Sequence, residues 1–206
     1  MLIGSGLKRS EHKKAEILAA AREIFLKEGY ADAGMESVAR AAGVSTATLY
    51  AYFPSKAELF RTVVVDSVRS MAEPVRESAN AVGDARARLT ALSRAYATFF
   101  ATPETRAMFR MVTAERRRFE GVADHFLGAA RESLGGAAIQ VVKELTASGD
   151  LKVDKPSWAA GQLMGMLDHA TLVLGLSAGD DVQPDRPVNQ IAEDAVETFL
   201  ARYATK

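Results

Sequence analysis

Residues 35–59 read MESVARAAGVSTATLYAYFPSKAEL, and this stretch decides the fold. Val38 and Ala42 are four residues apart, which places them on one face of a short helix. Gly43 suits the left-handed position that often follows a helix end, because a side chain there would be strained. Ser45 can cap a second short helix by accepting a hydrogen bond from a free backbone amide. Two short helices joined by a glycine turn form a helix-turn-helix, whose second helix can enter the DNA major groove.

The second short helix has one apolar face and one face that bears hydroxyls. At about 100° per residue, Leu49 and Phe53 centre the buried side. The opposite side is centred on alanines, which let the backbone approach base edges, and its margins carry hydroxyls that can bond phosphates or bases. From these faces we expect DNA contacts from Ser45, Thr46, Ala47, Thr48, Tyr50, Tyr52 and Lys56. Of these, Tyr52 and Lys56 should hold phosphates. The alternative is an ordinary tight helix pair with a solvated face, since such turns also occur without DNA.

The same stretch resembles the DNA-binding domain of the tetracycline-repressor (TetR) family. The shared residues are Ala39, Ala42, Gly43, Val44, Ser45, Leu49, Tyr50, Tyr52, Phe53, Lys56 and Leu59, with Ile17, Leu18, Ala21, Phe25, Gly29 and Tyr30 upstream. The resemblance implies a dimeric, ligand-responsive transcriptional regulator, most often a repressor, that binds a near-palindromic operator. One position departs from the family, which usually has Thr or Ser before the first helix of the motif. Here Ala33 and Gly34 stand there, so the phosphate contact of that hydroxyl is not carried over.

Composition narrows the function classes. The 206 residues carry 26 basic and 26 acidic side chains and no cysteine, which excludes disulfides and thiolate metal sites. Near the start, Lys8, Arg9, Lys13 and Lys14 face only Glu11, and this cluster is either a solvated helix start or an arm that reaches DNA phosphates. No apolar run approaches the length of a membrane span, and the first residues are too short for a signal peptide. We therefore expect a soluble, cytoplasmic protein.

Hydrophobic periodicity predicts an all-α protein of about nine helices. We expect a helix-turn-helix DNA-binding domain over residues 1–58 and a helical effector-binding and dimerisation domain over residues 59–206. The expected helices cover residues 10–28, 36–42, 46–53, 55–72, 85–101, 103–119, 121–148 with an interruption at Gly135 and Gly136, 158–177 and 188–204. Three arginines, Arg116 to Arg118, should complement the helix dipole at the end of the helix over 103–119.

The late helix over 158–177 is apolar on all sides, which predicts burial on every side. Gly161 and Gly165 weaken a helix, so close approach of another helix is a plausible reason for them. By resemblance to the family, the last two helices of each subunit form a four-helix bundle with those of a partner. The matching segments here are 163–174 and 191–200. The alternative is a core helix of a monomer.

Methionines and aromatic residues crowd the middle helices and suit a pocket for a small hydrophobic effector. The candidate residues are Phe99, Met108, Met111, Phe126, Trp158 and Met164. The alternative is that these side chains simply fill the core.

Other chemistry is not indicated. His12, His125 and His169 lack metal-ligand spacing, and no phosphate loop or nucleophile elbow occurs, so we expect no metal, no cofactor and no enzyme. Asp168 and His169 are expected to form a buried polar pair that satisfies itself, with a ligand-reading role as the alternative. The remaining rival function is a helical ligand-binding or scaffold protein without DNA binding.

Overall fold

The computed structural model describes residues 3–115, 117, 119, 121–179 and 181–205. Within these residues the chain is helical apart from turns, loops and an isolated antiparallel bridge between Leu151 and Ala204. The predicted all-α class is confirmed. The chain divides into two compact units, of which the first comprises Met1–Ser67 and Met111–Phe126 and the second Val68–Arg110 and Leu127–Lys206.

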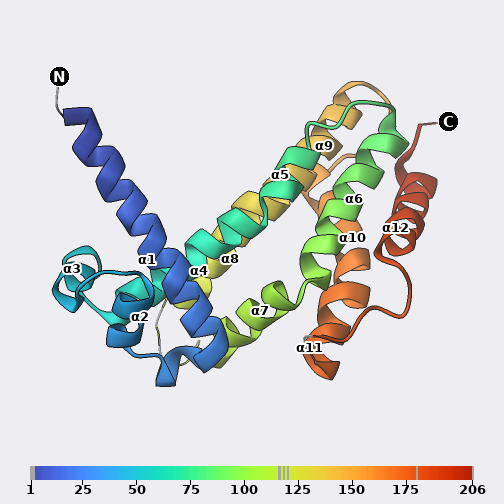
Figure 1. Ribbon diagram of the computed structural model, residues 1–206. Helices are drawn as coiled ribbons and strands as arrows, with labels where there is room; N and C mark the ends of the chain where they lie inside the picture. Colours follow the sequence, from blue (N-terminus) through green and yellow to red (C-terminus); the bar gives the residue numbers. More distant parts are fainter. Residues whose placement is uncertain (1–2, 116, 118, 120, 180, 206) are drawn as a thin grey trace. The chain divides into compact units, whose positions relative to one another are not determined.

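The first unit contains the predicted helix-turn-helix. Its helices are α1 (Ile3–Asp32), α2 (Met35–Ala41), α3 (Thr46–Tyr52) and the first part of α4 (Lys56–Met71). Helix α2 packs against both α1 and α3 (Figure 1). The predicted end of the first helix at Gly29 is a kink, because Gly29 has φ 76° and a last turn continues beyond it to Asp32.

Aromatic rings form the core of the first unit. The ring of Phe60 lies edge-on to Phe25 at 5.3 Å and to Tyr30 at 4.9 Å. Phe119 closes the group, since its ring centre is 4.4 Å from that of Tyr30. The rings of Phe25, Tyr30 and Phe60 are buried, and full burial of such a ring contributes on the order of 1.5–3 kcal/mol through removal of apolar surface from water. The cluster therefore fixes the end of α1 against α4, and this frame supports α2 and α3.

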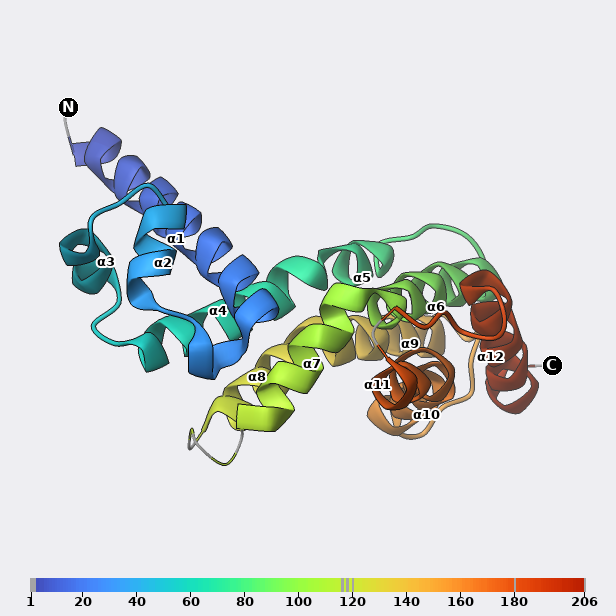
Figure 2. The same ribbon diagram turned by 60° about the horizontal axis from the view of Figure 1, so that its bottom comes forward.

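The second unit is a larger helical assembly. Its helices are the end of α4, α5 (Glu73–Ser78), α6 (Ala85–Ala101), most of α7 (Pro103–Glu115), the end of α8 (Val122–Ala130), α9 (Gly136–Ala147), α10 (Pro156–Asp168), α11 (Leu174–Ala178) and α12 (Val188–Tyr203). Helix α6 packs most extensively against α12 and also touches α9 and α10 (Figure 2). Asp84 caps α6 by accepting a hydrogen bond from the Ala87 amide at 2.8 Å.

Two π-helical turns, η1 (Arg131–Gly135) and η2 (His169–Val173), interrupt the long helices of this unit. The predicted interruption at Gly135 and Gly136 takes the form of the π turn η1, which ends at Gly135; both glycines keep right-handed helical angles, so the chain passes through η1 into α9. The late helix is likewise not continuous, since η2 separates α10 from α11. A π turn accommodates one extra residue without ending the helix, and such turns are frequent at functional sites.

The predicted burial of the late helix on every side is also wrong for the single chain. Its exposed large apolar side chains are Trp158 at 70%, Val173 at 46%, Leu174 at 42% and Leu176 at 40%. A Cβ added to Gly161 or Gly165 would meet no atom within 4 Å, so no helix of the same chain approaches there. One face of α10, η2 and α11 is therefore apolar and uncovered.

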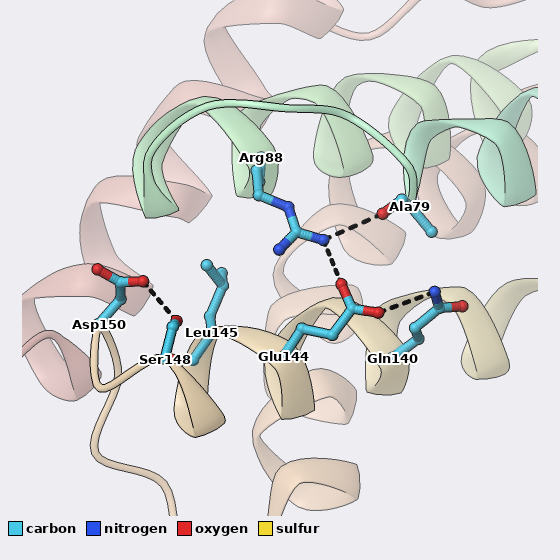
Figure 3. A network of polar contacts seen from close by, with 7 residues as sticks. All are labelled: Ala79, Arg88, Gln140, Glu144, Leu145, Ser148 and Asp150. Carbon is cyan, nitrogen blue, oxygen red and sulfur yellow. Dashed lines mark hydrogen bonds and ion pairs between the residues drawn. The ribbon is translucent and has the colours of Figure 1, made fainter.

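A network of polar contacts joins α6 to α9 and to the loop that follows α5. The guanidinium of Arg88 donates to the Ala79 carbonyl at 3.2 Å and to the carboxylate of Glu144 (Figure 3). Gln140 donates to the second oxygen of Glu144 at 3.0 Å. These hydrogen bonds, with that from Arg88 the larger cause, hold the pKa of Glu144 below its usual value.

No helix in the described part of the chain has both the length and the apolar character that crossing a bilayer requires.

Candidate DNA-binding interface

A tight glycine turn joins α2 to α3. Gly43 has φ 63°, the left-handed conformation that the sequence predicted for it. The amide of Val44 donates to the Ala39 carbonyl at 2.9 Å, and the amide of Gly43 donates to the Arg40 carbonyl at 3.2 Å. These bonds satisfy carbonyls at the end of α2 and fix the direction in which α3 begins.

Ser45 caps α3 as predicted. Its hydroxyl accepts a hydrogen bond from the Thr48 amide at 3.1 Å and lies 2.9 Å from the Thr48 hydroxyl. Leu49 is fully buried and Phe53 is 2% exposed, so the apolar face anchors the helix. The outer face presents Thr46, Ala47, Tyr50 and Ala51 as exposed residues. The cap thus orients one candidate DNA-contacting hydroxyl, that of Thr48, before any DNA is bound.

Tyr52 ties α3 to the first helix. Its hydroxyl lies within hydrogen-bonding distance of the Ser10 hydroxyl, at 3.2 Å. Nearby, the ammonium of Lys14 lies 5.9 Å from the centre of the Phe53 ring. The basic segment that the sequence left without a role is therefore adjacent to α3. Within this segment Arg9 and Lys14 are exposed, Lys13 pairs with Glu16 at 2.7 Å, and the side chain of Lys8 lies outside the described residues.

Lys56 has a structural contact that the sequence did not indicate. Its ammonium donates to the Ala31 carbonyl at 3.0 Å, near the end of α1, and lies 4.6 Å from the centre of the Tyr30 ring. The role of Lys56 at the DNA backbone stays a prediction.

Gly34 precedes α2 without making a side-chain cap, which matches the departure from the family pattern. Its backbone is extended, with φ −97° and ψ 139°, a conformation open to any residue. A Cβ at this position would meet the Ser37 hydroxyl at an ordinary 3.6 Å. The missing hydroxyl is thus a property of the sequence and is not forced by the fold.

The six candidate effector residues lie in different surroundings. Met111 and Phe126 belong to the first unit, and the other four belong to the second. Phe99 is buried in the large apolar core of the second unit and Met164 packs against that core. Met108 is 2% exposed, whereas Trp158 is exposed and lines a surface pocket of about 390 Å³ with Lys152, Lys155 and Arg202. A single pocket built from all six stays a prediction.

A second polar feature of the second unit was missed from the sequence. Asp168, the last residue of α10, hydrogen-bonds to Tyr96 of α6, and burial raises the pKa of the Asp168 carboxyl to about 6. Burial, followed by the charge of Asp168, also raises the pKa of Tyr96. The expected pairing of Asp168 with His169 is wrong, because His169 is exposed and Asp168 pairs with Tyr96. The partner on a distant helix could not be read from local spacing.

Among the described residues there is no group of three or more His, Cys, Asp or Glu side chains arranged to hold a metal ion.

Comparison with known proteins matches both parts of the chain. Residues 17–63 match the family described as bacterial regulatory proteins, tetR family, and residues 87–205 match that described as AefR-like transcriptional repressor, C-terminal domain. The HTH-type transcriptional activator FasR of Mycolicibacterium smegmatis is 38% identical over 96 residues. Those residues are 47% of this chain and 43% of that protein, so the match spans less than half the length of this curated relative.

Solved structures match over nearly the whole chain. A TetR-family transcriptional regulator from Mesorhizobium loti has a TM-score of 0.87 at 25% identity, covering 96% of this chain and 99% of that one. The flavonoid-responsive regulator FrrA has a TM-score of 0.73 at 29% identity, covering 95% and 99%. The two-part helical architecture is thus shared from end to end with regulators of one family.

Proposed function

The chain belongs to the TetR family of transcriptional regulators, and from this we propose that it binds an operator through α3 and releases it in response to a small hydrophobic effector. The observation that carries the proposal is the outer face of α3. Small and hydroxylated side chains stand outward there, while Leu49 and Phe53 hold the helix from behind. A face without charge or bulk at its centre suits close approach to base edges.

We assign the residues of this face by their position. Thr46, Ala47, Thr48 and Tyr50 lie nearest the bases, while Tyr52 and Lys56 hold phosphates. The bond between Ser10 and Tyr52 supports the second assignment, because it restricts where the Tyr52 hydroxyl can point. Phosphate contacts fix the register of a protein on the duplex, and base contacts supply specificity.

We further propose that the protein is a homodimer through α10, η2, α11 and α12. The uncovered apolar side chains of this face support that interface, as does a surface hollow of about 430 Å³ between α10 and α12. The hollow is lined by Gln162, Gly165, Met166, Thr198, Phe199, Arg202 and Tyr203. Because the dimer carries two copies of the helix-turn-helix, its operator is a near-palindrome. The half-sites lie roughly 34–36 Å apart or a multiple of that distance.

The effector is a small, mostly apolar molecule, and its binding lowers the affinity for DNA, so the protein acts as a repressor. The flavonoid-responsive relative supports an aromatic effector here. For release, the effector must bind the DNA-free conformation more tightly, and each tenfold change in DNA affinity requires about 1.4 kcal/mol of coupling. Because a protein that binds operator DNA must share a compartment with it, we propose a cytoplasmic location.

The test is selection of bound sequences from random duplexes by the purified protein. We expect a near-palindromic consensus that Ala47→Glu abolishes, because a carboxylate at the centre of the α3 face clashes with and repels DNA. The variant's helical content by circular dichroism must match that of the unmodified protein. If Ala47→Glu folds normally and binds the consensus with unchanged affinity, α3 is not the reading helix. If no sequence is selected at all, a helical protein without DNA binding is the better description.

A further inference from the structure

The Asp168 carboxylate has a buried oxygen atom without a hydrogen-bond partner within the described part of the chain. This atom is Oδ1, and Tyr96 of α6 is close enough to lower the pKa of the carboxyl in part. On α6, one turn before Tyr96, the hydroxyl of Ser93 is also buried and without a partner. Ser93 is completely inaccessible and Tyr96 is 5% exposed. Unpaired polar atoms thus occur on α6 and α10, two helices that pack against each other.

The surroundings of the pair are aromatic. The Tyr96 ring lies 4.8 Å from that of Phe100, and Phe100 in turn lies 4.8 Å from Phe99. Asp168 is followed directly by the π turn η2, which also packs against α6. The Asp168 carboxylate thus lies beside Tyr96, the first of three neighbouring rings, at the point where α10 passes into the π turn η2.

A purely structural role does not explain this arrangement. Buried polar atoms in folded proteins nearly always have a partner, and each exception calls for an explanation such as a ligand. An asparagine could accept the Tyr96 bond without a buried charge, and an apolar residue would leave no oxygen unpaired. Desolvation of Asp168 works against folding, as the raised pKa of its carboxyl indicates. A carboxylate that lowers the stability of the fold and has a raised pKa is a candidate ligand-binding group.

We propose that Asp168 Oδ1 is the recognition point of the effector site, and that it accepts a hydrogen bond from a hydroxyl or amino group on an aromatic ligand. The inference rests on the proposed function and narrows its effector class. The rings of Tyr96, Phe99 and Phe100 supply apolar contact with the ligand skeleton, and the Ser93 hydroxyl is a second polar group on the same helix. An aromatic molecule headed by a carboxylate is excluded at this point, because two like charges would face each other without water.

The test uses four ligands with one skeleton: 4-phenylphenol, 4-aminobiphenyl, biphenyl and biphenyl-4-carboxylate. Titration calorimetry of the full-length protein at pH 7.5 should show that the phenol and the amine bind at least about tenfold more tightly than biphenyl, because each donates a bond to a charged acceptor. The carboxylate should bind more weakly than biphenyl.

Asp168→Leu isolates the recognition step. This variant should bind 4-phenylphenol no more tightly than biphenyl, while its affinity for biphenyl stays equal or rises, a pattern that misfolding cannot produce. Asp168→Asn keeps an oxygen for Tyr96 and provides a second folded variant. In this variant the ratio of the dissociation constants of biphenyl and 4-phenylphenol should fall to half or less of its value in the unmodified protein. The matched control is Asp185→Asn, which removes an exposed carboxylate of the second unit and should change nothing.

Several results would overturn the proposal. These are equal binding of all four ligands, an unchanged preference for the phenol in Asp168→Leu, and no binding of any of the four. Operator binding, measured on the same preparations, separates this failure from failure of the proposed function. A protein that binds its operator but shows no dependence on Asp168 refutes the recognition point alone, whereas one that binds no operator refutes the regulator itself.

Discussion

Gly175 lies directly against the side chain of Arg106. A Cβ added to Gly175 would come within 2.6 Å of Arg106 Cδ and closer still to the guanidinium, so no other residue fits there without displacement. Arg106 is 1% exposed, and it donates to the carbonyls of Phe100 at 3.2 Å, Thr171 at 2.9 Å and Val182. One buried guanidinium therefore connects α7 to the end of α6, to η2 and to the loop before α12.

Gly175→Ala should destabilise the protein by about 1–3 kcal/mol, the usual result of overpacking a tight core. Urea unfolding measures the change. Gly128→Ala is the matched control, because an added Cβ there meets no atom within 4 Å and alanine favours a helix over glycine by up to about 1 kcal/mol. Equal stability of Gly175→Ala and the unmodified protein would show that Arg106 moves aside freely.

Asp168→Asn should stabilise the protein at neutral pH by roughly 1 kcal/mol, because the carboxyl is partly exposed and solvent screening reduces the 1.36 kcal/mol that each pKa unit would otherwise correspond to. Folding raises the pKa of the carboxyl from 3.8 to about 6, so the folded state favours the protonated form. The resulting stabilisation is fully present below pH 3.8 and is lost as pH rises through 6. Urea unfolding of both proteins between pH 4.5 and 7.5 should show a gap that widens with pH. A gap independent of pH would contradict the assignment.

Gly34→Ser should restore the missing cap of α2 and add a donor for a phosphate. The gain in helix stability is a few tenths of a kcal/mol, and one added hydrogen bond corresponds to a roughly two- to tenfold gain in operator affinity. Gly34→Ala controls for the side chain itself, since it fits the same space and lacks the hydroxyl. If Ser and Ala bind the operator equally, the position does not face a phosphate.

Lys56→Ala should have two separate effects. Affinity for all DNA sequences should fall alike, with the salt slope reduced by about 0.9 for the lost phosphate contact. Stability should fall by about 1 kcal/mol, because the bond to Ala31 is lost. Operator titrations at several salt concentrations and urea unfolding separate the two effects, with exposed Lys143→Ala as control. Lower stability with an unchanged salt slope would leave Lys56 with a structural role only.

Gly165→Leu should disrupt the proposed dimer, because it fills a hollow that a partner helix would enter. Light scattering at micromolar concentration should show monomers, and operator binding should weaken since two linked heads bind more tightly than one. Gly128→Leu makes the same change on α8 and should leave the dimer intact. A Gly165→Leu monomer that retains full operator affinity would contradict the symmetry argument.

Local chemistry made part of this protein predictable. The turn at Gly43 and the cap at Ser45 follow from residues within a few positions of each other, and the structure has both as expected. The predicted end of the first helix at residue 28 lies one residue before the observed kink at Gly29, for the same reason. Propensity and capping act over one helical turn, so such features need no knowledge of the tertiary fold.

Contacts between distant residues were not predictable. Arg106 bonds to Thr171 and Val182, and Tyr96 bonds to Asp168, across more than sixty positions of sequence. Neither arginine nor aspartate signals burial by its type, since both are normally exposed. The π geometry of η1 and η2 was not predicted, because the insertion of one residue leaves the hydrophobic pattern nearly unchanged. Burial of α10 on every side was wrongly predicted for the single chain, because apolar composition does not indicate whether a face is covered by the same chain or by another molecule.

Trp158 has a practical consequence for the study of self-association. It is the only tryptophan among the 206 residues, and it is 70% exposed in the first turns of α10, with the ammonium of Lys155 4.5 Å from its ring centre. Its indole fluorescence is therefore that of a hydrated ring in the separate chain. Coverage of this face by a second copy would remove that water and shift the emission to shorter wavelength. Trp158 emission measured over a dilution series would then give the dissociation constant of the dimer without a label.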